Sequence, residues 1–262
     1  MVSSMTREQI VEYMKLHYCG SNMVISIAGN FEEQEILDDL MRYFAEIPRF
    51  GMGNNANADA DTVPQFQRCL CERKKDVEQL YMNLAFSTMD ERDEERHVQI
   101  MANALLGGSN NSRLFQQVRE ELGLAYSVYS YSSLYRYAGL FHIDVIVNPA
   151  NAMRVYEKLA EILKNFSGTA ISKEELTSLY TQLRIEMIMG GESARNRMER
   201  NAKALLMHNR VVPLQETLEK LSKVTAEDIR VFGEKYFDLS KAGICLVGDI
   251  SEEAEEIKKH WC

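Results

Sequence analysis

The sequence predicts an α+β fold, with a mostly antiparallel sheet and helices packed on one face. Stretches of alternating apolar residues occupy 68–88 and 124–148, and long helical stretches follow from 150 to 221. A run of strands followed by a run of helices is typical of this class. A helix–turn–strand unit also recurs near the two ends of the chain, and this recurrence sets the expected domain boundaries.

Four strands are predicted before the long helices, at 68–74, 78–88, 124–135 and 139–148. In the last of them the apolar residues share one face: Phe141, Ile143, Val145 and Val147. His142 and Asp144 lie on the other face, which we expect to be solvated. The turn around 137–139 joins the last two strands and is short, so these strands should be antiparallel.

Helical spacing of apolar residues predicts helices over these ranges: 94–106, 112–121, 150–166, 172–189, 192–209 and 215–221. Gly107 and Gly108 follow the first of them and should stop it as C-cap residues. Ser172 and Glu175 have the spacing of a capping box at the start of the fourth helix.

Two segments of the chain repeat each other. "TREQIVEYMKLHYCGSNMVISIAG" begins at Thr6 and "TAEDIRVFGEKYFDLSKAGICLVG" begins at Thr225, at an offset of 219 residues (225 − 6). Each predicts a helix with a threonine N-cap and a Gln or Asp three residues later, then a polar turn, an apolar strand and another helix. The alternative is a coincidence between two ordinary units.

The repeat implies that each copy of a domain ends with this unit. The unit near residue 20 would then close a domain whose beginning is absent. We therefore expect residues 1–50 to be the C-terminal remnant of a first domain, 51–67 a linker, and 68–262 a complete second domain. The stretch "GMGNNANADADTVPQ" is rich in Gly, Asn and Asp, which favours an exposed linker.

Composition excludes several classes of protein. The formal net charge of -9 and the pI near 5.2 argue against nucleic acid as a partner. No apolar run approaches the ~20 residues of a membrane helix, so no membrane span is expected. The N-terminal stretch is also unlike a signal peptide, because no continuous apolar run follows a basic start.

The five cysteines show no repeating spacing, which favours reduced thiols in a cytosol-like compartment. Cys69 and Cys71 lie two apart on one predicted strand. A structural zinc site needs a second such pair, and none follows. We therefore predict no metal site in this chain.

The stretch "GGSNNSRLFQQVREELGLAYSVYS", residues 107–130, joins a helix to a strand. It is not a phosphate-binding loop, because Gly107 and Gly108 follow a helix and no lysine lies between them and the next helix. The dinucleotide-binding pattern G-x-G-x-x-G is absent from the chain as well. The sequence therefore gives no sign of nucleotide binding.

The longer run "LLGGSNNSRLFQQVREELGLAYSVYSYSS" resembles the signature of the second homologous domain in the insulinase/pitrilysin superfamily of zinc metallopeptidases, in the branch that includes mitochondrial processing peptidase. "EQLYMNLAF", "GLFHIDVIVNPANAMRVYEKL" and "HYCGSNMVISIAGNF" fit the same family, so the resemblance covers nearly the whole chain. It implies two similar halves, each a metallohydrolase-like α/β roll, that enclose a chamber. Such halves would explain the repeat.

In this family the first half carries H-x-x-E-H, in which two histidines bind zinc and the glutamate activates water. None of the five histidines of this chain begins that motif. The resemblance therefore implies no cofactor in this chain and zinc in a full-length parent. Alone, the chain should be inactive, and its expected partners are the missing N-terminal catalytic half and a peptide substrate.

The resemblance also implies roles for two residues of "REELGLAY". Arg119 and Tyr126 would contact the substrate and help to polarise the scissile carbonyl, as guanidinium and phenol groups can. The alternative is that Arg119 is a surface residue of a helix and Tyr126 is a strand residue packed at the sheet edge. Ser109, Asn110 and Arg113 are weaker candidates for a substrate-binding loop, since helix capping alone accounts for serine and asparagine there.

Three functions remain open. The favoured one is the C-terminal, substrate-binding half of an insulinase-type zinc peptidase, which contributes to peptide binding and transition-state stabilisation. The second is a non-catalytic binding or structural subunit that resembles the metal-free partner of processing peptidase. The third is a short chain that associates with itself, for instance as a homodimer. We expect a cytoplasmic, bacterial location, with mitochondria as the alternative.

Overall fold

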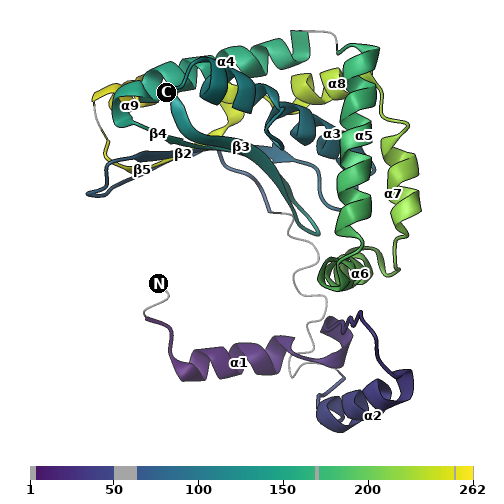
Figure 1. Ribbon diagram of the computed structural model, residues 1–262. Helices are drawn as coiled ribbons and strands as arrows, with labels where there is room; N and C mark the ends of the chain where they lie inside the picture. Colours follow the sequence, from purple (N-terminus) through teal and green to yellow (C-terminus); the bar gives the residue numbers. More distant parts are fainter. Residues whose placement is uncertain (1–3, 50–63, 169–170, 251, 262) are drawn as a thin grey trace. The chain divides into compact units, whose positions relative to one another are not determined.

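The computed structural model describes residues 4–49, 64–168, 171–250 and 252–261 (Figure 1). These residues form two compact units. The first unit comprises the described parts of residues 1–63 together with 187–212, and the second comprises 64–186 and 213–262. The predicted linker at 51–67 lies largely outside the described residues, and the predicted domain boundaries stay a prediction.

The second unit contains a five-stranded sheet in the order β1-β5-β2-β4-β3. Its strands are β1 (Leu70–Lys74), β2 (Leu80–Thr88), β3 (Ala125–Leu134), β4 (Gly139–Val147) and β5 (Gly243–Gly248). All neighbours are antiparallel except β1 and β5, which run parallel. The prediction of a mostly antiparallel sheet is confirmed, as are the four strands expected before the long helices.

Helices cover one face of this sheet, which we call the helix face (Figure 1). They include α3 (Arg96–Leu106), α4 (Ala152–Gly168) and α8 (Ala226–Tyr236). Alternate residues of β2, β4 and β5 are buried against them, because side chains of a strand point to opposite sides in turn. Five phenylalanines form an aromatic cluster with ring centroids 4.9 to 6.5 Å apart: Phe86, Phe141, Phe166, Phe232 and Phe237. We call the opposite side of the sheet the open face.

Four more helices follow in the sequence: α5 (Lys173–Gly190), α6 (Ala194–His208), α7 (Leu214–Leu221) and α9 (Glu252–Trp261). The helices predicted over 172–189, 192–209 and 215–221 are therefore confirmed with small changes at their ends. The predicted α+β class holds. None of the helices that the structure describes is long and apolar enough to cross a membrane.

The first unit contains α1 (Arg7–His17), a 3-10 turn (Gly20–Asn22), α2 (Glu33–Phe44) and α6. The strand predicted over 23–29 is wrong as a sheet strand, because these residues are assigned to no strand. A strand needs a neighbouring backbone, and the described part of this unit contains no other strand to supply one. Here the hydroxyl of Ser26 donates to the carbonyl of Met198 at 2.9 Å.

The structure bears out the internal repeat. Both α1 and α8 begin with a capping box, formed by Thr6 with Gln9 and by Thr225 with Asp228. The bounds of the two helices differ by the same 219 residues (226 − 7 and 236 − 17). In each copy a 3-10 turn follows, and the extended segment ends at a glycine with positive φ. The two copies therefore share the capped helix, the 3-10 turn and the closing glycine, although only the second copy forms a sheet strand.

The two copies differ in what covers them. Ile229 and Phe232 of α8 are both 0% exposed, whereas Ile10 and Tyr13, their counterparts in α1, are 52% and 58% exposed. The extended segments differ in the same way, with Ile244 and Leu246 buried but Ile25 and Ile27 exposed. Neither α1 nor α2 has a buried residue. The apolar side that the second copy places in a core is uncovered in the first.

Candidate functional site

The site predicted from the sequence begins where α3 ends. Gly107 is the C-cap residue, and its N–H donates to the carbonyl of Asn103 at 3.0 Å. The helix thus ends at a C-cap glycine as predicted, with φ −156° and ψ 9°. A glycine is needed here for space, since a Cβ would lie 2.7 Å from the backbone nitrogen of Ser130 on β3. Gly107 thus lets the helix end close against the strand.

The next segment, predicted as an α-helix over 112–121, is instead a π-helix over Phe115–Glu121. Leu114 and Val118 are fully buried on its inner side. Their spacing fits one turn of either kind of helix, so periodicity could not tell the two apart. Single π-turns occur frequently at functional sites. Gly123, at φ 59°, then reverses the chain into β3, and its N–H donates to the carbonyl of Arg119 at 3.1 Å.

Arg119 lies on this π-turn. Its guanidinium carbon is 4.9 Å from the centroid of the Phe115 ring, and its Nε is 3.9 Å from a carboxylate oxygen of Glu120. The side chain is 44% exposed, and an ion pair in water at this distance holds a charge only weakly. A guanidinium carries five N–H donors, so a side chain exposed to this degree is able to donate to a ligand.

Tyr126 lies at a β-bulge. Ala125 pairs with Val147 and Ser127 pairs with Ile146, so Tyr126 is an extra residue without a partner on β4. Such a bulge bends a strand and redirects a side chain, and bulges are frequent beside active sites. The Tyr126 side chain is 72% exposed, which leaves its hydroxyl open to a ligand. The alternation of side chains along this strand did not predict the bulge.

The three weaker candidates are arranged differently. The carbonyl of Ser109 accepts from the N–H of Ser112 at 3.1 Å, and the carbonyl of Asn110 accepts from Nε2 of Gln116 at 2.7 Å. Arg113 points toward the helices, 3.4 Å from Glu175 and 5.4 Å from the centroid of the Phe166 ring, and only 17% of its side chain is exposed. As substrate contacts these three residues stay predictions.

A polar row crosses the open face, and the sequence did not reveal it because it depends on strand order. Its members are paired across all five strands: Cys71, Cys245, Asn83, Asp144 and Tyr129. Part of this polar row lines a hollow of about 290 Å³, together with Tyr81, Ile146 and Val247. The side-chain amide of Asn83 donates to Asp144 and lies 3.4 Å from Nδ1 of His142.

Electrostatics favours the protonated form of two tyrosines on the open face, Tyr129 and Tyr131. Burial and then the charge of Asp144 raise the pKa of Tyr129 and of Tyr131. The ring of Tyr131 stacks on that of His142 with centroids 4.7 Å apart. Burial lowers the pKa of His142, and the charge of Asp144 only partly opposes this. The half-buried cluster thus carries one carboxylate and neutral neighbours.

Two histidines, the buried His97 and the half-buried His142, lead us to expect that stability depends on pH. Burial lowers the pKa of His97 and of His142 in the folded protein. The unfolded chain, with ordinary histidines near pKa ~6.5, therefore binds protons first as the pH falls. We expect the free energy of unfolding to be constant above about pH 7.5 and to decrease toward about pH 5.5. Urea unfolding at these pH values measures it, and His97→Gln combined with His142→Asn should flatten the decrease.

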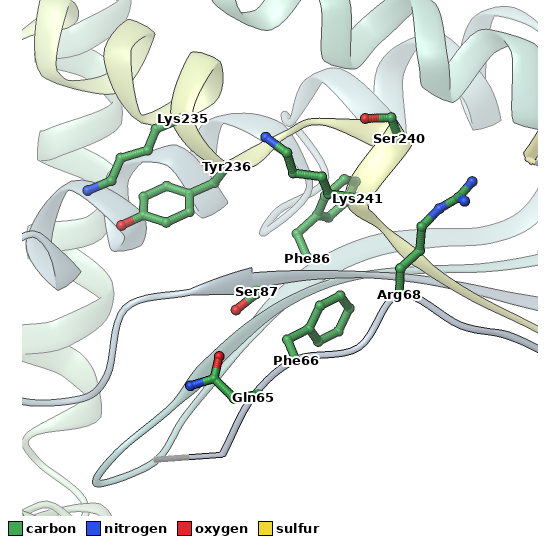
Figure 2. Close-up of a pocket in the computed structure, with 9 residues that line it drawn as sticks. All are labelled: Gln65, Phe66, Arg68, Phe86, Ser87, Lys235, Tyr236, Ser240 and Lys241. Atoms are coloured by element: carbon green, nitrogen blue, oxygen red, sulfur yellow. The ribbon is translucent and has the colours of Figure 1, made fainter.

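A second hollow, of about 380 Å³, lies where β2 and α8 end (Figure 2). Its cationic side chains are Arg68, Lys235 and Lys241. Each of them already has a partner. Lys235 lies 2.7 Å from Glu95, and Lys241 lies 3.0 Å from Asp238. Arg68 stacks on the ring of Trp261. These contacts neutralise or occupy the cations, so an anion would gain little from binding there.

The residues of this chain do not fit the zinc ion that the family resemblance implies. The sequence lacks H-x-x-E-H. In the described ranges, no three His, Cys, Asp or Glu side chains are grouped as metal ligands. We therefore assign no chemical step to a metal held by these residues.

Comparisons with known proteins give the same family. The chain is 30% identical over 236 residues to "Uncharacterized zinc protease YmxG" of Bacillus subtilis, covering 90% of this chain and 56% of that protein. It is also 30% identical over 239 residues to an "Uncharacterized zinc protease" of Rickettsia felis, with the same coverage. The chain thus spans just over half the length of these curated relatives.

Solved structures share its fold. A protease from Helicobacter pylori superimposes with a TM-score of 0.79 at 16% identity, over 94% of this chain and 60% of that one. A peptidase M16 inactive domain from Pseudomonas fluorescens gives a TM-score of 0.78 at 18% identity, over 95% and 59% of the two chains. The family described as "Peptidase M16 inactive domain" matches residues 4–183. On this match, the chain belongs to the peptidase M16 inactive-domain family.

Proposed function

We propose that this chain is the C-terminal, substrate-binding half of a zinc-dependent peptidase of the insulinase type. The observation that carries the proposal is the placement of Arg119 and Tyr126. A π-turn presents the first and a β-bulge presents the second, and both side chains are exposed. Backbone irregularities of both kinds are enriched at functional sites. The zinc-protease names of the relatives support the reaction class.

The chemistry of these two side chains suits a peptide substrate. A peptide presents carbonyl oxygens as acceptors, and both a guanidinium and a phenol are donors. As a carbonyl is attacked, negative charge develops on its oxygen and strengthens hydrogen bonds to it. Arg119 and Tyr126 would therefore bind the peptide and stabilise the transition state more than the ground state.

The uncovered copy of the repeat supports a partner half. In the second copy, α8 and β5 bury their apolar residues under the rest of their own domain. The first copy has the same backbone but exposes Ile10, Tyr13, Ile25 and Ile27. Exposed apolar groups arranged this way mark a surface that another part of a protein covers. We infer that an N-terminal catalytic half covers residues 4–49 and supplies the strand that would pair with 23–29.

Expression of the two halves as separate polypeptides tests this proposal. The chain alone should hold no zinc and leave an internally quenched peptide intact. Mixed with the catalytic half that belongs to it, the chain should co-purify and restore both zinc content and peptide cleavage. Zinc retained at one ion per chain by this chain alone would contradict the proposal. A complex that forms without cleavage would favour the non-catalytic binding subunit instead.

A further inference from the structure

Cysteines from two distant parts of the sequence meet on the open face of the sheet. Cys71 of β1 and Cys245 of β5 are direct partners in the parallel pairing of these strands, 174 residues apart in sequence (245 − 71). Paired residues of neighbouring strands point to the same side of a sheet. Cys69 precedes Cys71 by two residues, and its sulfur lies 3.6 Å from the position of a Cβ built on Gly243 of β5. Cys71 and Cys245 therefore meet at this edge of the sheet, with Cys69 beside them but not in a group with metal-ligand geometry.

The spacing selects one pair among the three. Neighbouring strands lie ~4.8 Å apart, within the ~4.4–6.8 Å range of Cα separations in disulfides. Cys69 and Cys71 are two residues apart along one extended strand, ~6.6 Å, at the upper end of that range. Cys71 is exposed and Cys245 is half-buried, so a small reagent can reach this pair.

Electrostatics agrees with this proximity. Burial and then the neighbouring Cys71 raise the pKa of Cys245. Burial raises the pKa of Cys69 too, followed by a side-chain hydrogen bond with Cys71 and then by the charges of Cys71 and Cys245. Thiols influence one another in this way only when they lie close together.

We propose that Cys71 and Cys245 form an oxidisable dithiol, which a hydroperoxide converts into a disulfide between β1 and β5. The thiolate of Cys71 attacks the peroxide, an S–O bond forms, the O–O bond breaks, and the leaving oxygen takes up a proton. The sulfur of Cys245 then attacks the sulfenic acid, an S–S bond forms, and the hydroxyl group leaves with the Cys245 proton as water. Two thiols lose two electrons, and the hydroperoxide is reduced to an alcohol, or to water when it is hydrogen peroxide.

The disulfide would act on two features of the sheet. Among the described strands, β1 lies at the edge of the sheet and pairs with β5, and the new bond would fix it there covalently. Cys245 also lines the hollow of about 290 Å³ that contains Asn83 and Asp144. Oxidation at this pair would therefore alter the edge of a polar surface without touching Arg119 or Tyr126.

Peptide mapping after treatment of the chain with hydrogen peroxide tests the proposal. Trypsin releases Cys69 and Cys71 together in residues 69–73, and Cys245 in residues 242–258, so Cys69→Ser is needed to identify the linked sulfur. Dilute protein is oxidised, the remaining thiols are blocked, and the digest is analysed without reduction. We expect residues 69–73 to be linked to 242–258 in the wild type and equally in Cys69→Ser. Cys71→Ser and Cys245→Ser should each abolish the link.

Circular dichroism tests whether each variant is folded. If Cys71→Ser or Cys245→Ser is not, the wild type and Cys69→Ser still identify the pair. The initial rate should rise with pH, because the thiolate is the reacting species. A link that disappears in Cys69→Ser would overturn the assignment. So would a folded wild type that forms no link between these peptides while its other thiols are oxidised.

Discussion

In the two-half protein, which is this chain combined with the catalytic half that belongs to it, replacement of Tyr126 by phenylalanine is expected to lower kcat for peptide hydrolysis. The expected loss is about 10²–10³-fold, the usual cost of removing one oxyanion donor. The change removes a single hydroxyl group. Because the Tyr126 side chain is 72% exposed and lies at a bulge, the fold should not depend on that hydroxyl. Steady-state kinetics with an internally quenched peptide measures kcat and KM separately.

Arg119→Ala should act in the same direction, and the double variant should lose less than the product of the two single losses. Groups that stabilise the same oxygen act as a unit, so their effects are not additive. Tyr135→Phe is a matched control, because Tyr135 is also an exposed tyrosine but follows the far end of β3. If Tyr126→Phe raised KM and left kcat unchanged, its hydroxyl would bind the peptide without stabilising the transition state.

Sequence patterns predicted the regular part of the fold because it depends on local chemistry. The alternation of Phe141 to Val147 places β4 with its apolar side toward the helices. Thr6 and Thr225 each begin a helix with a capping box, as their spacing to an amide or acid three residues later predicts. In these elements the local sequence preference and the tertiary structure favour the same conformation.

The irregular features of the candidate site could not be predicted in this way. The π-turn that carries Arg119 and the bulge at Tyr126 each involve one residue more than the regular structure. The spacing of apolar residues, with a period of 3.6 in helices and 2 in strands, does not reveal one extra residue within so short a segment. Only the family resemblance singled out these two positions, and the structure adds a physical reason for their exposure.

Strand pairing is the other kind of information that a sequence pattern lacks. Cys71 and Cys245 look unrelated along the chain, as do Asn83 and Asp144. The first pair meets because β5 inserts between β1 and β2, and the second because β4 pairs with β2. Local periodicity specifies neither pairing. The segment 23–29 shows the converse, because an apolar stretch with strand-like sequence forms no ladder where the described residues offer no neighbour.

The two copies of the repeat allow a matched test of burial. Phe232→Ala is expected to lower the free energy of unfolding by about 3–5 kcal/mol, the usual cost of emptying a buried phenylalanine site. Phe232 is 0% exposed, and its ring contacts those of Phe141, Phe237 and Tyr236 at centroid distances of 6.5, 5.5 and 4.8 Å. Phe232→Leu should cost less, because it keeps more of the volume. Urea unfolding followed by circular dichroism measures each change as a shift of the midpoint.

Tyr13→Ala changes the equivalent position of the first copy and should cost only about 0.5 kcal/mol in this chain. Tyr13 is 58% exposed, and its ring contact is with His17 one turn later, at a centroid distance of 4.3 Å. In the two-half protein the same change should cost about 2 kcal/mol or more, since a covered aromatic ring then loses its packing. An equally small cost in both forms would show that the catalytic half does not cover α1. A large cost in the chain alone would show that α1 already has a core of its own.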